Sequence, residues 1–465
     1  MANFVSPFAN AGRFLTNPVF RKAVIGFSGS AAITAAGMLL SPVISRLYRP
    51  ADYGEYAVFS ILLGNLSIVA SLNYLGALLL PRRIERFAAL AQLTLWLSTL
   101  VSIGFLGLLW LFEDHLLSFF DIHRIGGMTY WIPFLLVLSV LASCLQSLCI
   151  RENKYSVRAV SDVSANLSGK GYTIAHALWF GPSPGGFILG DVLNRLVAVG
   201  VVLARLPRRL LQPLVVPASL RRLFKTVYFF RRFPTQVLPS TYLNIVSSQL
   251  PVLLFKKFST SAEVGAFAFA SSMLELPVAL IGGALSPVVM REAVQVFHEG
   301  GVDRLGQFCG SYFRKIFLAL AIPFAAGAIL GDLIFPAVFG AQWQTAGAVA
   351  CLLASYYAFR VNYYIFVSVY TIVHKQLYDL FFNAVLLLAR FVAVYLVVQS
   401  HGFLAAVGAY SAVSLVLTAL NSYVLLAALR VRAWRVAIEQ VAYFAGLLAV
   451  LHFGRLGLQH FIAKG

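Results

Sequence analysis

The stretch Ile61–Leu80 reads ILLGNLSIVASLNYLGALLL, twenty residues without a charged side chain. A run of this length can cross a membrane, because about 20 helical residues span a bilayer core of roughly 30 Å. Of the 465 residues in the chain, only 11% are charged and 60% are hydrophobic, and the mean hydropathy is +0.83. Soluble domains carry roughly 25% charged residues. The sequence therefore indicates an all-α polytopic membrane protein, and it excludes a soluble enzyme and a nucleic-acid-binding domain.

Similar apolar runs predict twelve transmembrane helices and leave a thirteenth open. The predicted spans are 23–45, 55–80, 87–112, 128–150, 160–181, 184–205, 235–256, 262–290, 313–336, 343–373, 377–399 and 402–429, and the open one is 436–454. With the N-terminus inside, 25 of the 36 Lys and Arg residues fall in inside stretches and 7 in outside stretches. Because cytoplasmic loops are enriched in Lys and Arg, this bias predicts a cytoplasmic N-terminus.

The longest connection, Leu206–Pro234, divides the chain into two parts. Its basic residues alternate with apolar ones, as in an amphipathic helix that lies on an anionic inner leaflet. We therefore expect an N-terminal lobe of six spans (1–206), a basic amphipathic linker (207–234) and a C-terminal lobe of six spans (235–430). The remaining residues, 431–465, hold the open span and the C-terminal tail.

The two predicted lobes share a repeated sequence. RPADYGEYAVFS (Arg49–Ser60) aligns without gaps on TSAEVGAFAFAS (Thr260–Ser271), and Gly54 matches Gly265. Each stretch joins the first and second span of its half. Six spans per half, both starting inside, indicate parallel repeats related by an axis along the membrane normal. This organisation is typical of transporters that work by alternating access.

The stretch SRLYRPADYGEYA (Ser45–Ala57) resembles the first outside loop of bacterial polysaccharide and oligosaccharide flippases. These are the O-antigen-type, Wzx-like members of the MOP exporter superfamily, whose fold the lipid II flippase and the MATE antiporters share. The resemblance rests on Arg46, Pro50, Asp52, Tyr53, Gly54, Tyr56 and Ala57. The chain departs from lipid II flippases in one respect, since its first and seventh predicted spans carry no mid-membrane arginine.

The resemblance implies two six-helix lobes around a central cavity. It implies that the protein moves undecaprenyl-pyrophosphate-linked oligosaccharide from the cytoplasmic to the periplasmic leaflet of the bacterial inner membrane. The product would serve O-antigen, capsule or exopolysaccharide synthesis. No cofactor is expected, and the driving force would be a proton or sodium gradient. Membrane lipids, a polysaccharide polymerase and a chain-length regulator are the partners that this resemblance implies.

Charged side chains within the spans are the candidate substrate-binding residues, because charge is costly in a bilayer. Arg360 lies in YYAFRVNYY, with Tyr356, Tyr363 and Tyr364 at i−4, i+3 and i+4 on its face. A guanidinium can bind phosphate oxygens through two parallel hydrogen bonds, and tyrosines offer ring faces and hydroxyls to sugars. The alternative is a tyrosine-rich packing seam that satisfies Arg360 internally.

The N-terminal half offers two further candidate groups. Asp162, Asn166 and Lys170 are spaced i, i+4 and i+8 and share one helix face. Asp191 and Arg195 are spaced i, i+4 and are expected to pair. Lys170 and Arg195 are candidate ligands for pyrophosphate or an anionic sugar. The alternative for both groups is a structural interaction within the lobe.

Three carboxylates are candidates for ion coupling, since protonation removes the cost of burying their charge. They are Glu275, Asp191 and Asp162, and Glu275 could instead support a helix kink before Pro277. Arg46 either guides phosphate outward or holds the loop of the motif through a nearby acid.

Two other functional classes stay open at this stage. A MATE-type ion-coupled antiporter should expose carboxylates, but away from the loop borders the predicted spans hold four bases and five acids, so the count does not decide. A membrane polysaccharide polymerase or glycosyltransferase usually needs a large outside loop, and none is predicted. No Walker A run, HExxH or zinc-ligand spacing occurs, so we predict no catalytic residue and no metal site. The four cysteines are predicted to be core residues.

Overall fold

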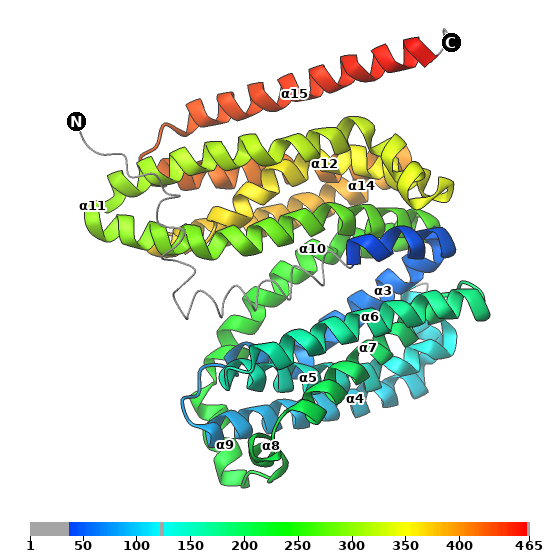
Figure 1. Ribbon diagram of the computed structural model, residues 1–465, viewed down its shortest axis with the longest axis vertical. Helices are drawn as coiled ribbons and strands as arrows, with labels where there is room; N and C mark the ends of the chain where they lie inside the picture. Colours follow the sequence, from blue (N-terminus) through cyan, green and yellow to red (C-terminus); the bar gives the residue numbers. More distant parts are fainter. Residues whose placement is uncertain (1–36, 121–124, 463–465) are drawn as a thin grey trace. The chain divides into compact units, whose positions relative to one another are not determined.

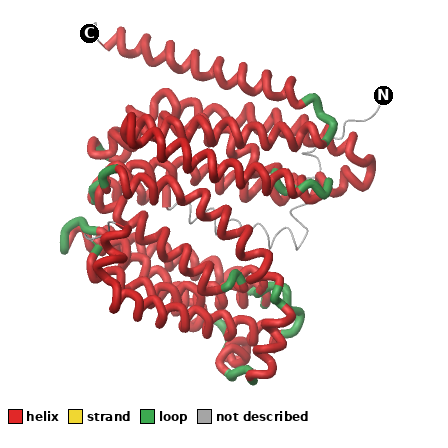
Figure 2. Tube along the Cα trace, turned by 180° about the vertical axis from the view of Figure 1, so that it is seen from behind, coloured by secondary structure: helices red, strands yellow, loops and turns green. Residues whose placement is uncertain are grey.

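The computed structural model of the chain describes residues 37–120 and 125–462. The described residues form helices joined by short loops and contain no β-strand (Figure 2). Contacts divide the chain into two compact units. Of the described residues, the first unit contains 37–47, 59–119 and 125–242, and the second contains 48–58, 120 and 243–462. Most of the first predicted span, 23–45, lies outside the described residues.

The first unit is built from the helices in the blue to green part of Figure 1. Its described elements are the helix Gly37–Leu47, most of α3 (Pro50–Ser71), η1 (Tyr74–Ala77), α4 (Ile84–Phe120), η2 (Gly126–Tyr130), α5 (Trp131–Arg151), α6 (Tyr155–Trp179), α7 (Pro184–Arg205), α8 (Arg208–Val215), α9 (Leu220–Phe229) and the short π-helix η3 (Phe233–Val237). The predicted linker corresponds to α8, α9 and η3. Its two α-helices are short, and Pro217 lies in the break between them, whereas Pro213 lies inside α8.

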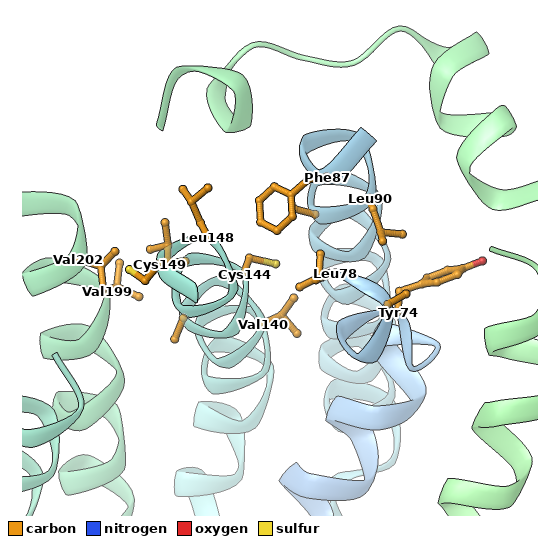
Figure 3. Close-up of a cluster of buried hydrophobic side chains, with 14 of the residues drawn as sticks. Tyr74, Leu78, Phe87, Leu90, Val140, Cys144, Leu148, Cys149, Val199 and Val202 are labelled. Carbon is orange, nitrogen blue, oxygen red and sulfur yellow. The ribbon is translucent and has the colours of Figure 1, made fainter. Parts of the chain in front are cut away.

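A buried hydrophobic cluster joins α4, α5 and α7 at the linker end of the first unit. Phe87 on α4, Leu148 on α5 and Val202 on α7 are almost inaccessible to solvent (Figure 3). Cys144 and Cys149 lie in the same cluster. Phe230, which follows α9, also belongs to it, so the linker is anchored in the core of this unit.

The second unit contains two long helices that are each broken at glycine. Its elements are α10 (Leu238–Phe258), α11 (Ser261–Phe339), η4 (Ala341–Trp343), α12 (Gln344–Phe366), α13 (Val369–Ile372), α14 (Gln376–Ala428) and α15 (Ala433–Ile462). Helix α11 breaks at Gly300 and Gly301, and α14 breaks at Gly402. Gly301 and Gly402 have φ of 66° and 79°, which glycine adopts without steric cost. The arms of these two helices correspond to four of the predicted spans.

Seven helices of the described chain are long and apolar enough to cross a membrane. They include the broken helices α11 and α14, which each supply two arms. The open span is also among them, as Ala433–Gly457 of α15. Arg455 lies within α15 and forms a bidentate salt bridge with Asp332 on α11, with N–O distances of 3.0 and 2.7 Å. This pair attaches the thirteenth predicted span to the second unit.

The repeated sequence forms a reciprocal contact inside the second unit. A Cβ atom placed on Gly54 would collide with the carbonyl oxygen of Ser261, and one placed on Gly265 would collide with the carbonyl oxygen of Pro50. Pro50 and Ser261 are themselves aligned in the repeat. The starts of α3 and α11 therefore cross through equivalent residues of the repeat.

Buried side chains reinforce this crossing. Glu55 on α3 is 1% exposed and pairs with Lys256 of α10 at 2.8 Å. The hydroxyl of Ser261 also donates to Glu55, at 2.7 Å. We expected Arg46 to hold this segment through Asp52 or Glu55; of these two acids, Glu55 pairs with Lys256. Arg46 lies at the exposed side of the preceding helix, Gly37–Leu47.

Candidate functional site

Arg360 lies in a polar cluster of the second unit, on α12. Its Nη2 atom is 3.1 Å from Glu275 Oε1 on the first arm of α11. Its Nη1 atom donates to the Tyr356 hydroxyl, one helical turn earlier, at 2.6 Å. The guanidinium also lies over the rings of Tyr356 and Tyr357, about 5.7 and 5.6 Å from their centroids. The expected contact between Arg360 and Tyr356 is therefore confirmed.

A second arginine completes this cluster. Arg390, on the first arm of α14, donates through Nη2 to the same Tyr356 hydroxyl at 2.9 Å. Its Nε atom donates to Ser414 at 2.9 Å, and its guanidinium lies 4.9 Å from the ring centroid of Tyr410. Two cations thus share one phenol oxygen. These contacts hold Arg390 beside Arg360.

The two arginines differ in accessibility. Arg390 is 3% exposed and Tyr356 is 2% exposed, whereas the side chains of Arg360 and Glu275 are 25% and 35% exposed. The Arg360–Glu275 pair therefore forms the accessible part of the cluster. Arg390 forms its buried part and is linked to Arg360 through the Tyr356 hydroxyl. Two guanidinium groups against one carboxylate leave a net positive charge. A phosphate oxygen that replaced the Glu275 carboxylate would find a guanidinium already positioned to bind it.

A second polar cluster of this unit surrounds Asp379, at the start of α14. Its carboxylate accepts from the Tyr363 hydroxyl at 2.7 Å and from the amides of Asn383 and Asn421 at 3.1 and 2.9 Å. Tyr370 in turn donates to the Asn421 side chain at 2.8 Å. No ion-pair partner of Asp379 occurs among the described residues. Tyr363 therefore belongs to this cluster and not to that of Arg360.

Tyr364 is also separate from the Arg360 cluster. Its side chain is 42% exposed, and its ring packs against Gly282 of α11. The helical periodicity correctly placed Tyr356, Tyr363 and Tyr364 on one side of α12. It did not specify which neighbouring helix meets each turn, because that depends on tertiary packing.

In the first unit, Lys170 lies beside the crossing of α6 and α7. A Cβ atom on Gly169 would be 2.8 Å from the carbonyl oxygen of Gly190, so the two helices are in close contact there. The Lys170 ammonium packs over Gly37, 2.7 Å from the position that a Cβ would occupy. Within the described residues Lys170 has no ion-pair partner.

Asp162 does not interact with Lys170, although both lie on α6. Its carboxylate accepts from Gln146 of α5 at 2.8 Å and lies 3.6 Å from Arg158. Between them, the Oδ1 atom of Asn166 is buried and has no hydrogen-bond partner among the described residues. The predicted stripe therefore divides into a paired carboxylate at one end and a single ammonium at the other.

The expected pair of Asp191 and Arg195 is confirmed on α7, with an N–O distance of 3.6 Å. Arg195 also donates to the hydroxyl of Ser139 on α5, at 2.5 Å. Both side chains of the pair remain about one-quarter exposed, at 25% for Arg195 and 28% for Asp191. The pair is thus only partly covered by the helix packing.

Sequence reasoning did not place Arg390, Asp379 or Tyr410 in the site. The signal for Arg390 and Asp379 was present, because each is a charge within an apolar span. Their partners come from other helices, which spacing along the sequence does not reveal. Among the described residues, no group of three or more His, Cys, Asp or Glu side chains is arranged to hold a metal ion.

The fold is similar to that of the lipid II flippase MurJ and of MATE transporters. The lipid II flippase MurJ, in an inward closed conformation, matches 93% of this chain over 99% of its own, with a TM-score of 0.64 and 10% identity. An inward-facing multidrug resistance MATE family transporter of the MOP superfamily also has a TM-score of 0.64, with 14% identity, covering 84% of this chain and 94% of its own. A variant of the Vibrio cholerae MATE transporter VcmN has a TM-score of 0.56 and 13% identity, covering 91% and 97%.

The family is shown by sequence. A family model described as "Polysaccharide biosynthesis protein" matches residues 43–348, which is more than half of the chain. The chain belongs to this family, and its resemblance to MOP-type flippases is confirmed. No curated protein matches the sequence.

Proposed function

We propose that this protein moves a pyrophosphate-linked oligosaccharide lipid across the bacterial inner membrane. The substrate would be an undecaprenyl-pyrophosphate-linked repeat unit, carried from the cytoplasmic to the periplasmic leaflet by alternating access. The N-terminus would lie in the cytoplasm. The observation that carries this proposal is the accessible guanidinium of Arg360, supported by a second, buried arginine. Membership of a polysaccharide biosynthesis family supports the sugar part of the substrate.

The binding step follows from the geometry around Arg360. Glu275 now holds one side of the guanidinium through a single contact of 3.1 Å. A pyrophosphate carries more charge than a carboxylate, so it competes for the same donors at a site of net positive charge. Tyr356 keeps the guanidinium oriented during this exchange. Lys170 and Arg195 are the proposed cationic contacts of the first unit.

The coupling step uses the carboxylates that lie beside these cations. Protonation of Glu275 would remove its attraction to Arg360 and release the guanidinium for phosphate. Asp191 beside Arg195 offers the same exchange in the first unit. Asp162, paired with Arg158, is the remaining coupling candidate. A proton or sodium gradient would then drive substrate release, without a bound cofactor.

The proposal is tested by complementation in the host. Deletion of the gene should abolish the surface polysaccharide and leave unpolymerised lipid-linked repeat units inside the cell. Wild type should restore the polymer, and Arg360→Ala should not. Arg360→Lys should restore only part of the polymer, because an ammonium keeps the charge but cannot bind phosphate in a bidentate geometry. Arg432→Ala is the matched control, since this arginine is exposed and lies outside the cluster.

Two results would contradict the proposal. Intact surface polymer with altered drug tolerance would favour a MATE-type antiporter, whose fold this chain shares. Loss of polymer together with loss of the lipid-linked units would favour an enzyme that assembles them, such as a glycosyltransferase. A polymerase and a chain-length regulator are the proposed protein partners, to be sought by crosslinking in the same strains.

A further inference from the structure

A basic pocket lies at the linker end of the first unit, apart from the residues assigned above. It has a volume of about 450 Å³, and the start of α4 and one face of α9 line it. Its charged lining residues are Arg83, Glu85, Arg86, Arg222 and Lys225. Four cations against one carboxylate give the pocket a strong excess of positive charge. The N-terminus of α4 adds backbone N–H groups that also favour an anion.

The four bases of this pocket have no ion-pair partner within the described part of the chain. A pocket of the second unit shows the contrast. That pocket, of about 730 Å³, also contains bases, but Arg430 pairs with Asp303 at 3.2 Å and Arg314 pairs with Glu439 at 3.1 Å. Two of its cations are therefore already paired with carboxylates of the protein. The pocket of the first unit instead keeps its cations available to an external anion.

Side chains of the first unit fix the shape of this basic pocket. The Gln92 amide on α4 donates to the carbonyl oxygens of Leu214 and Val216, at 3.0 and 2.6 Å, and accepts from the backbone N–H of Ala218 at 2.7 Å. It thereby fixes the turn between α8 and α9. Phe230, 5% exposed, holds the end of α9 in the hydrophobic cluster. Arg222 and Lys225 therefore lie on a helix that is anchored to the rest of the unit.

The other face of α9 is apolar and exposed. Leu220 and Phe224 are each 73% exposed, whereas Arg222 and Lys225 turn toward the pocket. The guanidinium of Arg86 lies 5.6 Å from the ring centroid of Phe229 at the pocket wall. An amphipathic helix with this division lies in the interface plane of a membrane, with its apolar side in the acyl region. The pocket therefore opens at the depth of lipid headgroups.

We propose that this pocket binds the phosphate headgroup of an anionic phospholipid from the adjacent leaflet, which the charge bias predicts to be the cytoplasmic one. The phosphodiester would contact Arg86 and Arg222, and the acyl chains would lie along the apolar side of α9. This inference requires only that the chain lies in a membrane. It is independent of what the protein transports.

The test uses the full chain in nanodiscs of phosphatidylcholine doped with phosphatidylglycerol. Native mass spectrometry measures the phosphatidylglycerol retained per protein as its content rises. Each pocket base removed should weaken retention roughly fivefold, so Arg86→Gln with Arg222→Gln should weaken it roughly 25-fold. The matched control is Arg209→Gln with Arg221→Gln, which removes two exposed bases of α8 and α9 that do not line the pocket. The control should keep most of the retention.

Three outcomes would overturn the proposal. Equal loss in the pocket and control variants would mean that only diffuse surface charge attracts the lipid. Millimolar inorganic phosphate that displaces phosphatidylglycerol would identify a site for a soluble anion. The third outcome concerns another variant, Arg86→Lys with Arg222→Lys. This variant keeps the positive charge and controls for misfolding of the glutamine variant. It should retain more lipid than the glutamine variant, and equal loss in both would contradict a charge-based pocket.

Discussion

The reciprocal crossing of α3 and α11 leads to a quantitative prediction about Gly265. In Gly265→Ala the new methyl group would collide with the Pro50 carbonyl oxygen, which is backbone and cannot rotate away. The two helices must therefore separate. Overpacking of this kind costs roughly 1–3 kcal/mol. Alanine recovers at most about 1 kcal/mol in helix propensity. We expect a net loss of about 1–2 kcal/mol in the free energy of unfolding.

The matched control is Gly283→Ala in the same helix. A Cβ atom at Gly283 would meet nothing within 4 Å, so this variant gains propensity without a collision. Its stability should rise by up to about 1 kcal/mol. At about 1 °C per kcal/mol for a chain of 465 residues, the melting temperatures of the two variants should differ by roughly 1–3 °C. Thermal unfolding of the purified protein, followed by circular dichroism, measures the difference.

The repeat adds a second test of the same crossing. Gly54→Ala should destabilise the protein as Gly265→Ala does. The double variant should lose less than the sum, because one displacement of the helices relieves both collisions. If Gly265→Ala is as stable as Gly283→Ala, or if the two glycine effects simply add, the reciprocal packing of the repeat is wrong.

The remaining predictions concern the polar contacts of the second unit. Tyr356→Phe removes two hydrogen bonds to cations and should lower the free energy of unfolding by about 2–4 kcal/mol. The control Tyr364→Phe, at a 42% exposed residue, should change it by less than about 0.5 kcal/mol. Equal melting temperatures of the two variants would contradict the geometry in which both arginines share the Tyr356 hydroxyl. Arg390→Met replaces a buried cation that has no carboxylate partner among the described residues, so the free energy of unfolding should be unchanged or higher. Transport should fall at least about tenfold. A variant with full transport would show that Arg390 has no role in transport. Asp332→Asn should loosen the attachment through Arg455 and raise amide hydrogen exchange in α15, with unchanged exchange as the opposing result.

Much of the fold could be predicted from apolar runs and from the repeat. The predicted spans 262–290 and 313–336 correspond to the two arms of α11, and 377–399 and 402–429 to those of α14. The alignment of Gly54 with Gly265 predicted equivalent positions. It did not predict that the two glycines would lie against each other, since a repeat specifies equivalence and not contact.

The site was less predictable, because its partners come from different helices. The Asp191–Arg195 pair could be predicted, since both residues lie one turn apart on one helix. Glu275 and Arg360 were separate candidates, and only the packing of α11 on α12 joins them. Tyr363 lies at the right spacing from Arg360, yet the start of α14 brings Asp379 to its hydroxyl. Spacing gives the face of a helix, and tertiary structure decides what meets it.

The most direct test of the central claim is a flipping measurement in proteoliposomes. Purified protein is reconstituted with a fluorescent undecaprenyl-pyrophosphate oligosaccharide, and a membrane-impermeant quencher reports the fraction in the outer leaflet over time. Wild type should exchange the lipid between leaflets, Arg360→Ala should exchange it no faster than protein-free vesicles, and Arg432→Ala should match wild type. Exchange by Arg360→Ala at the wild-type rate, or no exchange by wild type under a proton or sodium gradient, would contradict the proposed function.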